Sequence, residues 1–151
     1  MKQSKTKLNS LIDLDAYGIE LLAEIQLKPS DKAVVIALSG DLGTGKTTLV
    51  QTIARDLGIT EIVTSPTFVI LKQYETTDKY FSQLIHLDAY RIEKVEEMQP
   101  LGFTTLLKHP NTLICIEWAE RIKTLLPKET IWLKLETDSK GTHLISRHDN
   151  Q

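Results

Sequence analysis

A glycine-rich segment of this sequence has the residue types and spacing of a loop that binds phosphate. Residues 40–47 read GDLGTGKT, a complete match to the pattern GxxxxGK[ST]. Glycine permits the backbone angles with which main-chain N–H groups close around phosphate oxygens, and the N-terminus of a following helix adds its dipole and unpaired N–H groups. Lys46 is expected to reach the β- and γ-phosphates, and the Thr47 hydroxyl to bind Mg²⁺. We therefore predict a nucleotide-binding loop that consists of Asp41, Leu42, Gly43, Thr44, Gly45, Lys46, Thr47 and Thr48.

Two acidic residues follow apolar segments that are typical of buried strands. Asp88 comes directly after residues 84–87, and Glu117 after residues 113–116. A phosphate-binding loop needs an acid at a neighbouring strand end, and open α/β sheets bind ligands at the carboxyl ends of their strands. The pattern favours Glu117 as the metal ligand together with Thr47, while Asp88 polarises water or completes the magnesium shell. Lys46, Asp88 and Glu117 are thus the predicted catalytic residues.

Four further residues near these motifs each have a functional and a structural interpretation. Thr67 stands where a switch loop senses the γ-phosphate, or it is an ordinary turn residue. Trp118, next to Glu117, lies close to the nucleotide or belongs to the core. His86 is interpreted as a core residue or as support for the site, because no third or fourth metal ligand is near it in sequence. Arg91 pairs with a phosphate, with Glu117, or with a surface acid.

The segments around these motifs alternate between helical and strand patterns. Apolar spacing predicts helices over residues 12–25 and 46–57, and Pro127 ends a helix over 118–126. No linker divides the chain, so we expect a single domain over residues 1–151, with flexible tails at about 1–10 and 147–151. The remaining expected elements are strands at 33–38, 68–74, 80–87, 113–116, 131–135 and 143–146 and short helices at 93–99 and 104–108.

Composition restricts the class of protein and its surroundings. The chain has 151 residues, 41% of them hydrophobic, and a net charge of −2, which argues against a broad electrostatic contact with DNA or RNA. Cys115 is the only cysteine, so no internal disulfide forms and a reducing compartment is expected. No apolar run approaches the ~18 residues of a membrane span, and the N-terminus lacks the apolar core of a signal peptide. We expect a cytoplasmic protein without membrane contact.

Four sequence blocks together resemble the TsaE (YjeE) family of bacterial P-loop ATPases. They are GDLGTGKTT at 40–48, SPTF at 65–68, HLDAYR at 86–91 and IEWAE at 116–120, in the family's order and spacing. The resemblance implies an α/β fold, namely a P-loop NTPase-like three-layer sandwich with a mixed, mostly parallel central sheet. It also implies that Thr47 and Glu117 hold Mg²⁺, that hydrolysis requires Asp88, that Thr67 lies in a switch-like loop, and that Trp118 lies near the nucleotide.

The same resemblance implies a biological role. ATP and Mg²⁺ are the expected cofactors, and homologues of TsaD and TsaB the expected partners. That pair transfers threonylcarbamoyl to adenosine 37 of tRNAs that read ANN codons, so tRNA is reached only through the complex. ATP hydrolysis is expected to reset the complex between turnovers. The chain has only four arginines and no evident arginine finger, so we expect slow hydrolysis alone and faster hydrolysis with partners.

Three other functions fit parts of the pattern. A small-molecule kinase also begins with this loop, but kinases clamp phosphates with several arginines on a lid, which four scattered arginines do not suit. A GTPase is disfavoured because the sequence contains no Asn-Lys-x-Asp segment. A binding module that uses ATP only as a structural switch would keep its biological activity when Asp88 is replaced and hydrolysis is lost.

Overall fold

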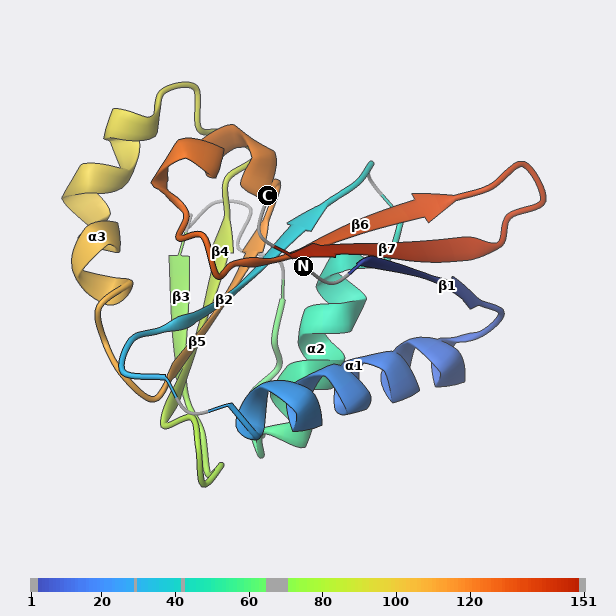
Figure 1. Ribbon diagram of the computed structural model, residues 1–151, viewed down its shortest axis with the longest axis horizontal. Coiled ribbons are helices and arrows are strands. Elements are labelled where there is room, and N and C mark those ends of the chain that lie inside the picture. The colour runs from blue at the N-terminus through green and yellow to red at the C-terminus, as the bar shows by residue number, and fades with distance from the viewer. Residues whose placement is uncertain (1–2, 29, 42, 65–70, 150–151) are drawn as a thin grey trace.

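A seven-stranded sheet with helices on both faces forms the body of the molecule (Figure 1). The computed structural model describes residues 3–28, 30–41, 43–64 and 71–149. The helices are α1 (Leu11–Gln26), α2 (Lys46–Asp56) and α3 (Phe103–Leu106), with 3₁₀ helices η1 (Val95–Leu101) and η2 (Ala119–Leu125). The strands are β1 (Gln3–Leu8), β2 (Val34–Ser39), β3 (Leu71–Glu75), β4 (Gln83–Asp88), β5 (Thr112–Glu117), β6 (Ile131–Thr137) and β7 (His143–Asp149).

The sheet is parallel at its centre and antiparallel at both sides. Its order is β1-β7-β6-β2-β5-β4-β3, in which β6–β2, β2–β5 and β5–β4 are the parallel pairs. The central strands β2 and β5 are nearly continuous apolar runs because both of their faces are buried. The mixed sheet with a parallel centre is the architecture that the resemblance implied.

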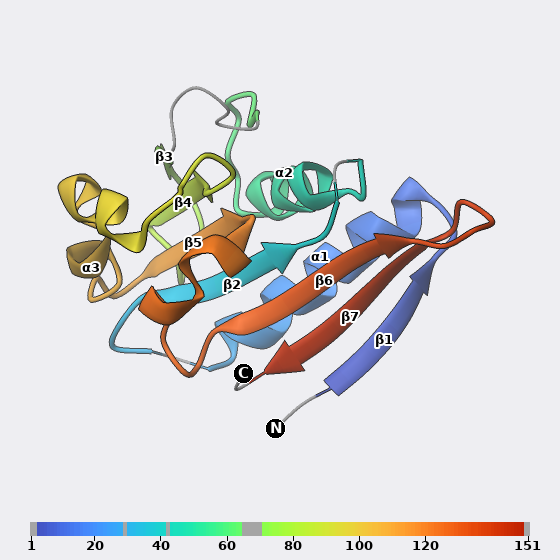
Figure 2. The same ribbon diagram turned by 90° about the horizontal axis from the view of Figure 1, so that it is seen from above.

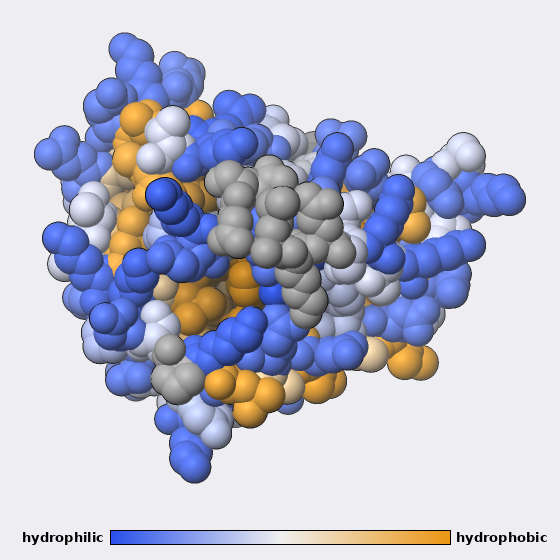
Figure 3. All heavy atoms as spheres, viewed as in Figure 1, coloured by the Kyte–Doolittle hydropathy of each residue, from blue (hydrophilic) through white to orange (hydrophobic). Residues whose placement is uncertain are grey.

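Two separate cores hold the three layers together (Figure 2). Alternate residues of β2 face opposite sides: Ile36 and Leu38 pack toward α1 and α2, whereas Val35 and Ala37 pack toward η1, α3 and η2. This alternation follows from the twofold periodicity of a strand. Viewed as in Figure 1, the surface is hydrophilic over most of this face, with apolar atoms gathered near α3 and along α1 (Figure 3).

The described parts of the two segments expected as flexible tails belong to strands of the sheet, while residues 1–2 and 150–151 lie outside the described residues. Gln3–Leu8 form β1, which pairs antiparallel with β7 in a register from Gln3↔His148 to Leu8↔His143. The C-terminal segment is equally fixed, because the nearly buried Arg147 guanidinium donates from Nη2 to Glu24 Oε2 at 2.6 Å. Backbone pairing along the edge of β7 orders a segment whose own composition is mostly polar.

Most other predicted elements are confirmed, with shifted ends. The strand expected at 80–87 begins at Gln83, because the Asp78 carboxylate accepts the N–H groups of Tyr80 and Phe81 at 2.9 Å and holds a turn there. The helix expected from residue 118 begins at Ala119 and is a 3₁₀ helix. Of the strand expected at 68–74, residues 68–70 lie outside the described residues. Among the described residues, no helix is long and apolar enough to cross a membrane.

Candidate functional site

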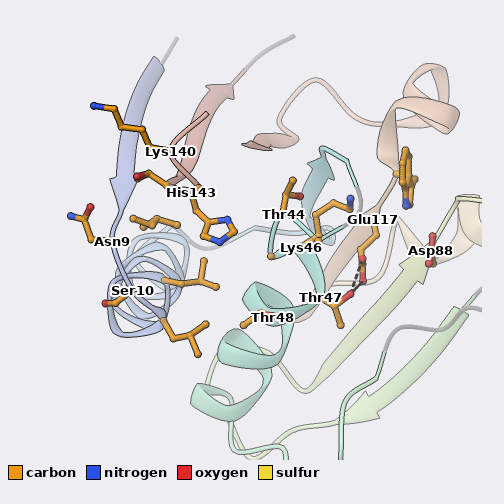
Figure 4. A pocket seen from close by; sticks show the side chains of 18 of the residues that line it. Asn9, Ser10, Thr44, Lys46, Thr47, Thr48, Asp88, Glu117, Lys140 and His143 are labelled. Carbon is orange, nitrogen blue, oxygen red and sulfur yellow. Dashed lines mark hydrogen bonds between the residues drawn. The ribbon is translucent and has the colours of Figure 1, made fainter. Parts of the chain in front are cut away.

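The phosphate-binding loop and both predicted acids meet at one edge of the sheet. The strands β2, β5 and β4 run parallel, so their carboxyl ends share this edge, and the register pairs Leu38 with Glu117 and Glu117 with Asp88. A pocket of about 960 Å³ opens over it (Figure 4). The residues that line this pocket are Leu8, Asn9, Ser10, Leu11, Leu14, Gly43, Thr44, Gly45, Lys46, Thr47, Thr48, Asp88, Tyr90, Glu117, Trp118, Lys140, Gly141, Thr142 and His143.

The backbone of the loop requires glycine at two positions. Gly40 has φ +133°, and a Cβ there would lie 2.2 Å from the carbonyl oxygen of Leu135. Gly45, at φ +104°, precedes the first residue of α2. The first N–H groups of a helix lack intrahelical acceptors, and the first such bond of α2 runs from Leu49 N to Gly45 O. The donors at the start of α2 therefore make an anion-binding site within the pocket.

Lys46 directs its ammonium group into the loop. The residue is buried, and Nζ donates to the carbonyl oxygens of Gly40 and of Asp41, the latter at 3.0 Å. Burial lowers the pKa of Lys46, while nearby carboxylates, Glu117 foremost, act in the opposite direction. The ammonium also lies 4.5 Å from the centre of the Trp118 ring. A cation so placed, with carbonyl oxygens as its hydrogen-bond acceptors, suits an incoming phosphate.

Thr47 and Glu117 form the oxygen-rich part of the pocket. The Thr47 hydroxyl lies 2.9 Å from Oε1 and 3.0 Å from Oε2 of Glu117 (Figure 4). Hydroxyl and carboxylate oxygens are the ligands that Mg²⁺ prefers, and proteins commonly bind this ion through one or two carboxylates and the phosphates of a substrate. The described residues contain no group of three or more His, Cys, Asp or Glu side chains that could hold a metal by themselves. The pair therefore fits Mg²⁺ that arrives with a nucleotide.

Asp88 and Trp118 complete this end of the pocket. Asp88 is 7% exposed, and its Oδ1 accepts the N–H of Tyr90 at 2.9 Å. Trp118 has a left-handed backbone with φ +57°, which ends β5 and places its ring 5.0 Å from that of Tyr90. Leu42 and Thr67, both predicted to contact nucleotide, lie outside the described residues. All the other predicted site residues apart from Asp41 line the pocket, and Asp41 contributes its carbonyl oxygen to Lys46.

The opposite end of the pocket was missed by the sequence analysis. Asn9 and Ser10, from the turn between β1 and α1, and Lys140 and His143, from the hairpin between β6 and β7, lie across the pocket from Lys46 (Figure 4). A signal was present, because Ser10 caps α1 by accepting the N–H of Asp13 at 3.3 Å, a spacing typical of a helix start. Because a flexible tail was expected over about residues 1–10, this signal did not lead to a prediction that the segment lines the site.

Comparisons with known proteins agree with this geometry. The family model described as threonylcarbamoyl adenosine biosynthesis protein TsaE matches residues 8–146. The chain is similar to the tRNA threonylcarbamoyladenosine biosynthesis protein TsaE of Bacillus subtilis, with 40% identity over 81% of this chain and 72% of the relative. The protein of the same name from Haemophilus influenzae is 32% identical over 83% of this chain and 78% of its own length. The crystal structure of Bacillus subtilis YdiB superposes with a TM-score of 0.70 at 26% identity and covers 99% of this chain and 87% of that one.

Proposed function

The chain belongs to the TsaE family, and from that premise we propose that it is a Mg²⁺-dependent ATPase of tRNA threonylcarbamoyladenosine formation. The observation that carries the proposal is the junction of three parts in one pocket. These parts are the N-terminus of α2, the buried ammonium of Lys46, and the hydrogen-bonded pair of Thr47 and Glu117. Phosphoryl transfer is mostly a matter of positioning and of neutralising charge, and each part serves one of these needs.

The residues have distinct roles in the proposed reaction. The loop and the first N–H groups of α2 bind the β- and γ-phosphates, and Lys46 exchanges its carbonyl acceptors for phosphate oxygens. Thr47 and Glu117 hold Mg²⁺, which when bound neutralises phosphate charge. Asp88, at the end of the strand next to Glu117, orients the attacking water and accepts its proton.

The far end of the pocket suits the nucleoside. With the triphosphate at the loop, the base extends toward a wall that includes the apolar side chains of Leu8, Leu11 and Leu14. The imidazole of His143 lines the same end and offers an aromatic face to a purine. β1 and the β6–β7 hairpin thus join the loop in building a complete nucleotide site.

Homologues of TsaD and TsaB are the proposed partners, with tRNA reached through their complex in the cytoplasm. The arginines support slow hydrolysis by the isolated chain, because no arginine lines the pocket within the described part of the chain. Arg55 pairs with Asp15 at 3.3 Å, and Arg147 with Glu24, each away from the loop. The Arg121 guanidinium lies beside the pocket, 5.5 Å from the centre of the Tyr90 ring and 5.9 Å from that of Trp118, but does not line it. Stabilisation of the transition-state charge by an arginine is worth about 10³–10⁵ in rate, so a partner that supplies one would accelerate the reaction strongly.

Phosphate release from ATP tests this proposal. We expect slow, Mg²⁺-dependent release by the isolated chain, faster release with TsaD and TsaB homologues, and none from an Asp88→Ala variant. A control with radiolabelled ATP identifies the product that carries the transferred phosphate. Label that appears on a small molecule other than free phosphate would indicate a kinase instead, and equal rates with and without partners would contradict the role of the complex.

A further inference from the structure

A histidine buried inside the sheet contacts Glu117, one of the two residues proposed to hold Mg²⁺, on the side away from the pocket. His86 lies in the middle of β4, is 0% exposed, and pairs in register with Cys115 of β5. Its Nε2 lies 2.6 Å from Oε2 of Glu117, two residues further along β5. The ring therefore reaches along the sheet toward the edge where the pocket opens, although it does not line the pocket itself.

Among the described residues, the one hydrogen bond of this ring is to a residue of the site. Buried polar atoms in proteins are ordinarily hydrogen-bonded, so a histidine kept only for packing is expected to have partners at both nitrogens. Within the described residues, His86 Nδ1 is buried without a hydrogen-bond partner, whereas Nε2 bonds to Glu117. Because a carboxylate only accepts hydrogen bonds, Nε2 carries the proton and donates it. In the part of the chain that the structure describes, this side chain thus has one polar interaction, and that interaction is with Glu117.

Glu117 is held between two donors on different elements. The Nε2–H of His86 in β4 fixes Oε2 from inside the sheet, and the Thr47 hydroxyl in α2 reaches both oxygens from the side of the pocket. Without the imidazole, the Thr47 hydroxyl would be the one side-chain donor left to Glu117 among the described residues. Groups that bond to a metal ligand from behind change metal affinity by about ten- to a hundredfold when they are removed.

We propose that His86 is a positioning residue that holds the Glu117 carboxylate in the orientation that binds Mg²⁺ together with Thr47. The inference rests on the proposed function, because it assigns a task to His86 at the same nucleotide site. It predicts that the loss of His86 weakens Mg²⁺ binding specifically. Binding of the nucleotide itself through the loop and Lys46 is expected to stay intact, since no hydrogen bond joins the imidazole to Lys46 or to the described residues of the loop.

Two substitutions of similar size separate donation from packing. In His86→Leu the core stays filled, but Glu117 loses the donor. In His86→Gln the side-chain amide nitrogen takes the place of Nε2 and can still donate. The measurement is a calorimetric titration of Mg²⁺ into the full chain saturated with a non-hydrolysable ATP analogue, preceded by a titration of the analogue in EDTA.

The expected result is a Mg²⁺ affinity about ten- to a hundredfold weaker in His86→Leu, largely restored in His86→Gln, with affinities for the analogue in EDTA unchanged. An unchanged Mg²⁺ affinity in His86→Leu would overturn the inference. So would equal losses with and without Mg²⁺, or a failure of His86→Gln to restore binding. If His86→Leu does not fold, His86→Asn, whose amide is too short to reach Glu117, takes its place. A wild-type chain whose nucleotide binding ignores Mg²⁺ would instead contradict the proposed function, and the inference with it.

Discussion

Replacement of Lys46 by methionine is expected to weaken ATP binding strongly while leaving the unliganded fold intact. Methionine fills a similar volume, so the packing against Trp118 is kept. The carbonyl oxygens that lose their donor belong to Gly40, which is half-buried, and to Asp41, which is exposed, so water can replace the ammonium. Burial lowers the pKa of Lys46, which means that the folded state holds this charge at a cost. We therefore expect the free energy of unfolding without nucleotide to change by less than about 1 kcal/mol.

The effect on nucleotide binding is expected to be much larger. A hydrogen bond to a charged group contributes about 1.5–3 kcal/mol, so its loss weakens ATP binding by about ten- to more than a hundredfold. At an ATP concentration of about 100 times Kd, the wild-type chain gains about 2.7 kcal/mol in unfolding free energy. At the same concentration, a variant with a hundredfold weaker affinity gains only about 0.4 kcal/mol.

Denaturant unfolding with and without Mg²⁺ and ATP measures both effects in one series. Lys140→Met is the matched control, because Lys140 lines the same pocket but is exposed and far from the loop. A pH series tests the direction in which the free energy of unfolding changes with pH. The unfolded chain holds the Lys46 proton more tightly than the folded chain, so the contribution of this residue to stability rises as pH increases toward 10.5. This contribution is absent in Lys46→Met. Equal stabilisation of Lys46→Met and wild type by ATP would refute the reasoning, as would a large loss of stability without ATP.

Three further predictions concern other parts of the molecule. Gly40→Ala is expected to abolish ATP binding and to lower the unfolding temperature, because its Cβ would meet the Leu135 carbonyl. Gly43→Ala has the cost of φ +78° but meets nothing within 4 Å, so it is expected to lower that temperature less, and equal losses would contradict this. His143→Ala is expected to weaken calorimetric binding of ADP but not of pyrophosphate, and parallel losses for both would place the base elsewhere. Burial raises the pKa of Cys115 to about 12, so its thiol is expected to resist a thiol reagent at neutral pH until the chain is unfolded; rapid labelling of the folded chain would show that β5 opens.

The local signals in the sequence were strongest where one segment determines its own structure. The loop before α2 was predicted from its glycines, because Gly40 and Gly45 adopt backbone angles that other residues rarely reach. The apolar runs before Asp88 and Glu117 predicted strands, the second of them a buried parallel one, and their observed register places the two acids side by side. The roles of these acids toward Mg²⁺ and water stay predictions, as do those of Leu42 and Thr67.

The features that were missed depend on partners distant in sequence. Gln3–Leu8 contain one strongly apolar residue, Leu8, and become a strand only through pairing with β7. The end of the pocket opposite Lys46 was missed for the same reason, since the pairing of β1 with β7 brings Asn9 and His143 together. The left-handed backbone of Trp118, which precedes the 3₁₀ helix η2, also has no sign in the sequence, because a non-glycine residue rarely adopts it.

A crystal structure of the chain with Mg²⁺ and a non-hydrolysable ATP analogue would show whether the pocket binds nucleotide as proposed. We expect the triphosphate along the loop, with Lys46 Nζ within hydrogen-bonding distance of the β- and γ-phosphates. We also expect Mg²⁺ about 2.0–2.1 Å from Thr47 Oγ1, with Glu117 beside the ion and in contact with it or its water shell. A nucleotide bound elsewhere on the molecule, or one bound at the loop with the ion away from both Thr47 and Glu117, would contradict the proposal.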